Sequence, residues 1–477
     1  MRWCSGTLLV MNPQAPELTA DLIRRFDVSG PRYTSYPTAD RFVEAFGHEQ
    51  YVQALEARAQ AAGVMGGRGA PLSLYVHIPF CESVCYYCAC NKVITKHHDR
   101  AGEYLVALKK EIELHVDRLG AGHAVTQLHF GGGSPTFLND AELAHLMSYI
   151  KEAFRLIPGA EISIEVDPRT VTRDRLQHLW QCGFNRLSFG VQDFNPDVQK
   201  AVHRVQSHQM VVELMQAARD IGFESINVDL IYGLPKQTAE TFATTVAQVS
   251  ALRPDRIALY AYAHLPARFK PQRRINAEEL PPADQKVAML VQAVKGFQQG
   301  GYTYIGMDHF ALDTDALAVA KRQGRLHRNF QGYSTQPDCD LVALGVSAIG
   351  RIGPIYSQNA KTLEEYYDAL SRGELPVQRG LSLSRDDLVR RAVIMALMCQ
   401  GRVDYESIEL AHLVNFQQYF SQEMQEIDRL AGLGLVQREP DGLRVTAVGW
   451  YFVRAVAMVF DRYLQTDRNR ERFSKII

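Results

Sequence analysis

The sequence of 477 residues contains no long apolar run, no excess of charge and no internal repeat or low-complexity tract. No apolar stretch reaches the ~18 residues that a membrane-spanning helix needs, so we expect no membrane span. The formal net charge of -1 provides no global basic field, which argues against a nucleic-acid partner. The apolar part of residues 1–11 is too short for a secretory signal, and Met11 is an alternative start of the chain.

Cysteine is also scarce, but four of the eight cysteines occur within ten residues. Cys81, Cys85, Cys88 and Cys90 follow directly after an apolar segment that is predicted to be a strand. The Cys-x3-Cys-x2-Cys spacing of the first three can place three thiolates on one iron–sulfur cluster and leave one iron without a protein ligand. An open iron is reactive, so the spacing predicts redox or radical chemistry. Cys90 is only two residues beyond Cys88 and would strain a shared cluster.

Other interpretations of these cysteines remain open: structural zinc, a four-cysteine electron-transfer cluster, and redox-active or inert thiols. Structural zinc usually takes two ligand pairs with a longer spacer, and no second Cys/His pair stands at a suitable distance. A disulfide framework is typical of short secreted chains. The scattered Cys182, Cys339 and Cys399 are expected to be buried, reduced thiols, which predicts a cytoplasmic protein.

Short apolar segments alternate with amphipathic segments from about residue 70 to 310. We expect strands near 72–78, 126–130, 161–166, 186–191, 225–231 and 256–262. We expect helices near 140–156, 172–182, 208–221, 238–252 and 282–299, after a first helix with Tyr104, Leu108, Ile112 and Leu119 on one face. Six βα units in series predict an α/β fold with a parallel sheet, either a barrel or a doubly wound sheet.

Different patterns precede and follow this region. Residues 1–70 are predicted to be an N-terminal extension and linker, in which the prolines of the aromatic segment 30–37 exclude a helix. Tyr33 and Tyr36 of this segment either dock the N-terminus or contact a ligand. Residues 71–375 form the predicted barrel domain with segments that cover the substrate. In 376–477, helices near 385–400 and 413–430 precede a hairpin at 435–446, which resembles a winged-helix module. Because no dense basic stripe is evident, we favour a packing or lid domain over DNA binding.

Polar and glycine-rich segments stand at the C-terminal end of every predicted strand, where barrels and open α/β sheets bind ligands. These segments are His77 with the cysteines, 129–136, 165–168, 190–193, 229–233 and 260–264. The glycines 131–133 let a ligand approach the backbone closely. Glu165, Asp167 and Asp229 suit ribose hydroxyls or an ammonium group, with structural salt bridges as the alternative. His264, His309 and His327 are expected either to cover the site or to serve as packing residues.

The cysteine triplet with Tyr87 before its last member resembles the signature of radical S-adenosylmethionine (SAM) enzymes. From about residue 20 to the end, the chain resembles the family of oxygen-independent coproporphyrinogen III oxidases of bacterial heme synthesis. The segments that carry this resemblance are 31–38, 77–81, 88–92, 131–136, 165–169, 190–194, 229–235, 306–310 and 327–333. Ala89 and Ser134 replace a common Gly and Thr of the family, which puts only fine geometry in doubt. The resemblance implies a (β/α)6-type partial TIM barrel as the radical SAM core.

The resemblance also implies the site residues. A 4Fe–4S cluster would be held by Cys81, Cys85 and Cys88, and a first SAM that chelates its open iron would contact Tyr75, Gly132 and Glu165. Tyr75 joins the three cysteines as a catalytic residue in this assignment. A second SAM would lie near a further set: Tyr87, Cys90, Gly133, Ser134, Gln192, Arg204, Asp229, Ala263 and Ile349.

The implied activity is the conversion of two propionates of coproporphyrinogen III to vinyl groups, which gives protoporphyrinogen IX. A 5′-deoxyadenosyl radical would take a hydrogen from the β-carbon of each propionate, and CO2 and one electron would then leave. A low-potential electron donor and an electron acceptor are implied as partners, with the chain as a monomer. Arg32 and Arg268 are candidates for pairing with substrate carboxylates, with a solvated surface role as the alternative. Another radical SAM reaction on a tetrapyrrole and a heme carrier or chaperone remain the alternatives, and Cys90 and the segment 33–38 argue against the carrier.

Overall fold

In the computed structural model, which describes residues 19–26, 28–64, 69–336 and 339–466, a twelve-stranded sheet forms the centre of the molecule. Its order is β16-β15-β14-β13-β1-β4-β5-β6-β7-β8-β10-β9. The predicted strands are all present and mutually parallel: β1 (Leu72–Ile78), β4 (His123–Gly132), β5 (Phe154–Val166), β6 (Arg186–Gln192), β7 (Ser225–Tyr232) and β8 (Arg256–Ala261). Because this order follows the chain without the reversal of a doubly wound sheet, the barrel interpretation is confirmed.

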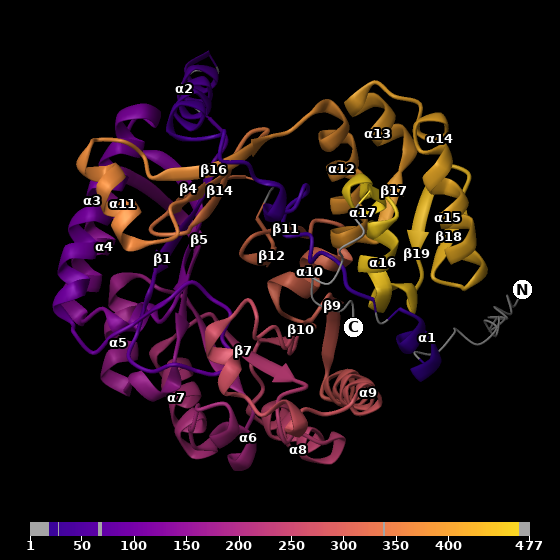
Figure 1. Ribbon diagram of the computed structural model, residues 1–477, viewed down its shortest axis with the longest axis horizontal. Helices are drawn as coiled ribbons and strands as arrows, with labels where there is room; N and C mark the ends of the chain where they lie inside the picture. Colours follow the sequence, from indigo (N-terminus) through magenta and orange to yellow (C-terminus); the bar gives the residue numbers. More distant parts are fainter. Residues whose placement is uncertain (1–18, 27, 65–68, 337–338, 467–477) are drawn as a thin grey trace, which may run out of the picture.

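Helices connect these strands and cover the outer side of the curved sheet (Figure 1). They are α3 (Asp99–Leu119), α4 (Asp140–Ala153), α5 (Arg173–Cys182), α6 (Pro196–Ala201), α7 (His208–Ile221), α8 (Ala239–Leu252) and α9 (Ala283–Gln299). The prediction of a helix as far as residue 156 is wrong. The backbone of Phe154 is already extended, and β5 pairs with β4 from this residue.

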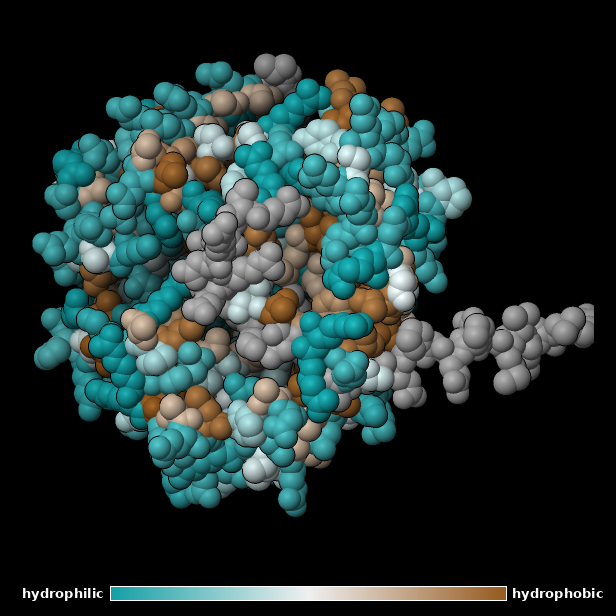
Figure 2. Space-filling view, turned by 45° about the vertical axis from the view of Figure 1, so that its right-hand side comes forward, coloured by the Kyte–Doolittle hydropathy of each residue, from teal (hydrophilic) through white to brown (hydrophobic). Residues whose placement is uncertain are grey.

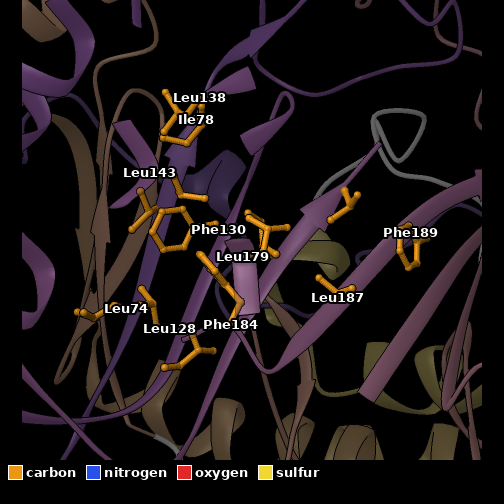
Figure 3. Packing of buried hydrophobic residues seen from close by; sticks show 14 of the residues in the cluster. Leu74, Ile78, Leu128, Phe130, Leu138, Leu143, Leu179, Phe184, Leu187 and Phe189 are labelled. Carbon is orange, nitrogen blue, oxygen red and sulfur yellow. The ribbon is translucent and has the colours of Figure 1, made fainter. Parts of the chain in front are cut away.

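Along the parallel strands, apolar side chains that face the outer helices alternate with side chains that face the barrel interior. Leu74 and Ile78 of β1, Phe130 of β4 and Phe189 of β6 are buried against the outer helices, together with Leu179 of α5 (Figure 3). Because successive side chains of a strand point to opposite faces, the intervening residues face the interior of the barrel. The interior residues are largely polar, so the same six strands provide both a core and a lined cavity.

The edges of the sheet extend beyond the prediction. At one edge, β13 (Asp340–Leu344) runs parallel to β1 and is followed by antiparallel β14 (Ile349–Ile352), β15 (Ile355–Asn359) and β16 (Val377–Ser382). At the other edge, β10 (His309–Leu312) and β9 (Tyr302–Gly306) are antiparallel. Within the described residues the two edges do not pair with each other, so the barrel is open. Smaller elements complete this region: β2 (Phe80–Cys81), β3 (Val93–Ile94), α10 (Ala316–Arg322), β11 (His327–Asn329), β12 (Gly332–Ser334) and α11 (Leu363–Ser371).

The C-terminal part is mostly helical and lies opposite the open side of the barrel (Figure 1). It contains α12 (Arg385–Gln400), β17 (Arg402–Asp404), α13 (Tyr405–His412), α14 (Phe416–Tyr419), α15 (Ser421–Gly432), β18 (Val436–Glu439), β19 (Gly442–Val445), α16 (Val453–Met458) and α17 (Arg462–Thr466). The predicted hairpin is β18–β19, and β17 adds a third strand to it. The prediction of one helix over 413–430 is wrong, because Leu413 has a positive φ of 53° and Asn415 caps a new helix.

The N-terminal segment joins the two parts. Its helices α1 (Ala20–Arg25) and α2 (His48–Val64) flank an extended stretch in which Tyr33 and Tyr36 are fully buried. These rings belong to a second apolar core that is shared with α12, α15 and α16 and with residues of 305–333. The packing interpretation of the two tyrosines therefore describes their environment. The apolar cores cross the predicted boundaries near 70 and 375, which stay a prediction, and Met1, Cys4 and Met11 lie outside the described residues.

No helix in the described parts of the chain combines the length and apolar character that crossing a bilayer requires. The face seen in Figure 2 is mostly hydrophilic, with hydrophobic residues in small groups.

Candidate active site

Two adjoining cavities lie at the C-terminal ends of the parallel strands. The first, here called the cysteine cavity, has a volume of about 670 Å³ and is lined by Cys81, Cys85 and Cys88. The second cavity, of about 680 Å³, is lined by side chains that include Tyr75 and His77. The two share four lining residues: Cys90, Gly132, Glu165 and Tyr260. The predicted gathering of the strand-end segments is therefore observed.

Backbone hydrogen bonds fix the cysteine loop over the glycine triplet. The loop is closed by pairing of β2 with β3, and the Ser134 amide donates to the Phe80 carbonyl at 2.8 Å. A Cβ atom on Gly133 would lie 2.6 Å from the Pro79 carbonyl oxygen, so only glycine allows the two segments to approach this closely. The loop is thus held by backbone contacts, while its thiols line the cavity.

Cationic side chains surround the thiols. Arg204 Nη1 lies 3.5 Å and Arg169 Nη2 lies 3.7 Å from Cys85 Sγ, and both arginines also donate to Asp167. Lys92 Nζ donates to the carbonyls of Cys88 and Cys90 at 3.2 and 3.3 Å. Burial raises the pKa of Asp167, but the hydrogen bonds from Arg169 and the charge of Arg204 outweigh it and leave this pKa lowered. The carboxylate therefore stays ionised and holds the two arginines beside Cys85.

This environment fits an anionic iron–sulfur cluster with three thiolate ligands. Three thiolates would bring more negative charge than a cluster core compensates, and the nearby cations offset it. Arg204 Nε is buried without a hydrogen-bond partner in the described structure. In the same described residues, no three His, Cys, Asp or Glu side chains converge as a site for one metal ion.

Two neighbouring side chains orient Asp229, which lines the cysteine cavity. It accepts hydrogen bonds from Asn227 Nδ2 at 2.8 Å and from Ser188 Oγ at 3.1 Å. Burial and the nearby charge of Glu165 raise the pKa of Asp229 to about 6. Each oxygen of Asp229 keeps acceptor capacity beyond these bonds, which suits the hydroxyl groups of a ribose.

Tyr75, His77 and His129 form one wall of the second cavity. His77 Nε2 lies 3.1 Å from the Asn91 carbonyl, which can only accept, so Nε2 carries the proton and Nδ1 accepts from Tyr75 at 3.0 Å. Burial lowers the pKa of His77 and keeps the ring neutral. Tyr75 stacks on His129 with 5.9 Å between ring centroids, and His129 Nε2 lies 3.5 Å from Glu165. The wall is thus a fixed polar network.

Most residues that the resemblance gives to the second SAM line the cysteine cavity, whereas Tyr75 lines the second cavity. The cysteine cavity is lined by Tyr87, Gly133, Ser134, Gln192, Arg204 and Asp229, which the resemblance gives to the second SAM. Tyr75, from the set for the first SAM, lines the second cavity together with Ile349. Ala263 is linked to the loop indirectly, because Gln272 Nε2 donates to the carbonyls of both Ala263 and Tyr87 at 3.2 and 3.1 Å.

Several lining residues were not singled out from the sequence. Tyr260 stood in a strand-end segment without an assigned role, and Phe330 and Gln331 stood in the segment 327–333, which carries the resemblance, also without a role of their own. Other lining residues come from loops and edge strands with no recognisable pattern: Phe269, Ser347, Gln358 and Lys361. His309 is half-buried and packs against Tyr260 and Tyr333, and burial lowers its pKa to about 3, which agrees with the packing interpretation. His264 lies 2.9 Å from Tyr262 Oη. His327 lies on β11, just before Phe330.

The two arginines predicted for substrate carboxylates lie in different settings. Arg32 forms an ion pair with Asp308, and its guanidinium lies 5.2 Å from the centroid of the Tyr260 ring. Arg268 is exposed and lies 5.4 Å from the centroid of Phe269, a residue that lines the second cavity. A role of either arginine in binding substrate stays a prediction.

Comparison with known proteins gives consistent similarities along most of the chain. A family model described as the radical SAM superfamily matches residues 75–249, and one described as the HemN C-terminal domain matches residues 383–452. The chain is 49% identical over 460 residues to an oxygen-independent coproporphyrinogen III oxidase of Pseudomonas aeruginosa, which covers 96% of the chain and 98% of that protein. The Escherichia coli enzyme of the same name is 47% identical over 98% of the chain and 100% of its own length. The solved structure of coproporphyrinogen III oxidase (HemN) from Escherichia coli, described as a radical SAM enzyme, is similar with a TM-score of 0.88 at 47% identity, over 94% of the chain and 100% of that structure.

Proposed function

The chain belongs to the family of oxygen-independent coproporphyrinogen III oxidases, and from this premise we propose how its two cavities serve that reaction. The enzyme is an oxidoreductase that converts two propionate side chains of coproporphyrinogen III to vinyl groups with loss of CO2, giving protoporphyrinogen IX for heme synthesis. The observation that carries the proposal is the placement of three thiols, among cations, at the C-terminal ends of the parallel strands.

Cys81, Cys85 and Cys88 would hold a 4Fe–4S cluster, and Arg169, Arg204 and Lys92 would offset its negative charge. When bound, the cluster and SAM supply the radical chemistry that removes a hydrogen atom from the substrate. The protein's own contribution is to bind, to orient and to exclude water and oxygen.

We assign the SAM beside the cluster to the residues that line the cysteine cavity. Asp229 would accept hydrogen bonds from ribose hydroxyls, and Gly132 and Gly133 line the same cavity. This assignment gives most of the set that the resemblance implies for the second SAM to the SAM beside the cluster, because these residues surround the cysteines, whereas Ile349 stays with the second cavity.

The second cavity would hold a second SAM next to the substrate. Its support is a volume similar to that of the cysteine cavity and the four lining residues that the two cavities share. Tyr75, with its hydroxyl fixed by neutral His77, and Glu165 would bind polar groups of this molecule.

The partners follow from the electron balance. Each propionate that becomes a vinyl group loses CO2, a hydrogen atom and one electron, so the reaction needs a low-potential one-electron donor for the cluster and an electron acceptor for the substrate. We also infer a cytoplasmic location, since free thiols and a thiolate-bound cluster require a reducing compartment. That the enzyme acts as a monomer is a further part of the proposal.

The test is anaerobic incubation of the reconstituted protein with SAM, a reductant and coproporphyrinogen III, followed by mass analysis. Loss of two CO2 per tetrapyrrole together with 5′-deoxyadenosine is the expected result. Cleavage of SAM without decarboxylation would keep the radical site and reject the substrate. A heme carrier would instead bind heme stoichiometrically and form neither product.

The two-SAM assignment has its own readout. Equilibrium dialysis with labelled SAM is expected to give two bound molecules per chain in the wild type and one in Tyr75→Ala. A stoichiometry of one in the wild type would contradict the assignment of the second cavity.

A further inference from the structure

Cationic side chains gather beside the second cavity. Lys361 lines this cavity and is also exposed to solvent, so it stands at the opening. Arg379 and Arg268 stand beside the same cavity, because their contact residues Gln358 and Phe269 also line it. Burial and the charges of these two arginines lower the pKa of Lys361. Like charges that are brought together repel, so the arrangement favours binding of an anion.

Side chains that line the cavity orient two of these cations. Arg379 Nε donates to Gln358 Oε1 at 2.7 Å, while Gln358 Nε2 donates to the Ser347 carbonyl at 3.1 Å. Gln358 is buried and lines the cavity, so Arg379 is fixed beside the cavity. Arg268 lies over the ring of Phe269, which lines the same cavity.

The charges of Lys361 and Arg379 are not neutralised by close carboxylates. Among the described residues, the Lys361 ammonium group has no ion pair, and neither it nor the terminal nitrogens of Arg379 have a hydrogen-bond partner. The acidic groups that act on this cluster are Asp40, Glu44 and Glu365, and none of them comes within ion-pair distance of Lys361 or Arg379. Donors thus remain available for a ligand.

The neighbouring walls of the cavity are apolar. Phe269, Phe330, Ala348 and Ile349 line it together with Lys361. An anion that also presents a broad apolar surface fits this combination, since its carboxylates would meet the cations while its body covers the aromatic rings.

We propose that Lys361 and Arg379, with Arg268 beside them, form a carboxylate-binding subsite that holds propionate side chains of the tetrapyrrole substrate at the opening of the second cavity. The proposal rests on the proposed function, because coproporphyrinogen III carries four propionates on an apolar macrocycle. SAM also carries a carboxylate, so the experiment must separate the two sources.

The experiment measures equilibrium binding of two probes by fluorescence: coproporphyrin III and its tetraamide, which keeps the macrocycle without the negative charges. The variants are Lys361→Gln, Arg379→Gln and the double variant. Lys110→Gln, which removes an exposed lysine of α3, is the matched control. Because each lost contact is a hydrogen bond between charged groups, we expect the Kd for the tetraacid to rise roughly ten-fold in each single variant, with little change for the tetraamide.

Two further measurements identify the source of the carboxylate and the state of the fold. Labelled SAM is expected to bind all variants with wild-type stoichiometry and affinity; loss of SAM binding instead would overturn the proposal and assign the cations to SAM. Arg379→Lys is expected to recover part of the affinity for the tetraacid, and circular dichroism confirms folding of every variant used. Tetraacid binding at wild-type strength in a folded double variant would also overturn the subsite.

The proposed function and the proposed subsite would be rejected by different results. If the wild type releases no CO2 from coproporphyrinogen III, the reaction is wrong, whatever the binding results. If it does release CO2 while the double variant binds the tetraacid normally, only the subsite is wrong.

Discussion

Arg204 connects three parts of the cysteine cavity through one guanidinium group. It contacts Cys85 Sγ, donates to Asp167 at 3.1 Å and donates to the Gly190 carbonyl at 2.7 Å. The loop, the end of β5 and the end of β6 are therefore held together by a single buried charge. Such outer contacts tune a metal centre as well as position its ligands.

We predict that Arg204→Met lowers cluster incorporation several-fold, because a cation that offsets the cluster charge is removed. Iron and sulfide content per chain measures this directly. Removal of a buried ion-pair partner also costs roughly 3 kcal/mol of stability, which needs a control. Arg186→Met supplies it, since Arg186 is similarly buried and lies 3.5 Å from Glu161 but does not line the cysteine cavity.

The control variant is expected to lose comparable stability while retaining wild-type iron content. Arg204→Lys is expected to lie between Arg204→Met and the wild type, because it keeps the charge but loses the planar donors. Equal iron loss in Arg186→Met and Arg204→Met would mean that only general stability matters.

At the residue scale, the sequence identified site residues whose type and spacing are distinctive, but it did not show which distant side chains lie beside them. The cysteines, Gly133, Glu165 and Asp229 were predicted for the site, because their types and spacing suit few other uses. Lys361 and Arg379 carry no such pattern, since an isolated lysine or arginine is usually a solvated surface residue. Only the folding of the edge strands brings them together.

At the scale of elements, one buried carboxylate joins α3 to the edge of the sheet. Glu111 accepts hydrogen bonds from the Gly345 amide, Asn359 Nδ2 and Tyr366 Oη, each at 2.7 Å. These partners belong to the turn after β13, to β15 and to α11. Residues of the same turn and of β14 line the second cavity, so this network fixes the position of one cavity wall.

Glu111 should make stability depend on pH. Burial raises its pKa from 4.5 to about 7 in spite of its hydrogen bonds. The folded state therefore binds a proton more tightly than the unfolded state, and this contribution to the free energy of unfolding falls as the pH rises from about 4.5 to about 7. Above that range the contribution is constant.

We predict that Glu111→Gln removes this dependence, because the amide cannot ionise. Relative to the wild type, the free energy of unfolding of the variant is expected to rise by roughly 2.5 kcal/mol between pH 5 and pH 8, as measured by urea unfolding. Glu113→Gln on the exposed side of α3 is the control and should show no such change. A difference between wild type and Glu111→Gln that stays the same at both pH values would contradict the prediction.

Strand prediction succeeded where the chain alternates regularly. The six parallel strands each contain an apolar segment that is buried on the helix side, and these segments are regularly spaced between amphipathic helices. Strands β13 to β16 are short, and three of them are joined by tight turns and buried by contacts with α2 and α3, which lie far away in the sequence. Nothing local therefore marked them as part of the same sheet.

At the scale of the whole molecule, the N-terminal segment connects the barrel with the C-terminal helices. In Figure 1 the indigo chain between α1 and α2 runs along the boundary of these two parts. Tyr33 Oη donates to Asp461 Oδ2 at 2.9 Å, and Arg454 Nε donates to the Pro31 carbonyl at 3.1 Å. Val43 pairs with Gly380 of β16. The segment therefore contacts both parts. It places Arg32 against the ring of Tyr260, which lines both cavities.

We predict that Tyr33→Phe loosens this segment without unfolding the barrel, because it removes a buried hydrogen bond to a carboxylate and leaves Asp461 less satisfied, at a cost of about 1–3 kcal/mol. Hydrogen–deuterium exchange of residues 28–47 is expected to speed up by roughly ten-fold, while exchange in α3 and SAM binding stay unchanged.

Tyr51→Phe is the matched control, since its hydroxyl is also buried but lies 3.2 Å from His115 Nε2, away from this boundary. If the docked segment helps to close the cavity, Tyr33→Phe should raise the KM for coproporphyrinogen III more than Tyr51→Phe does. Unchanged exchange in 28–47 would mean that the remaining contacts of Arg454 and Val43 hold the segment by themselves.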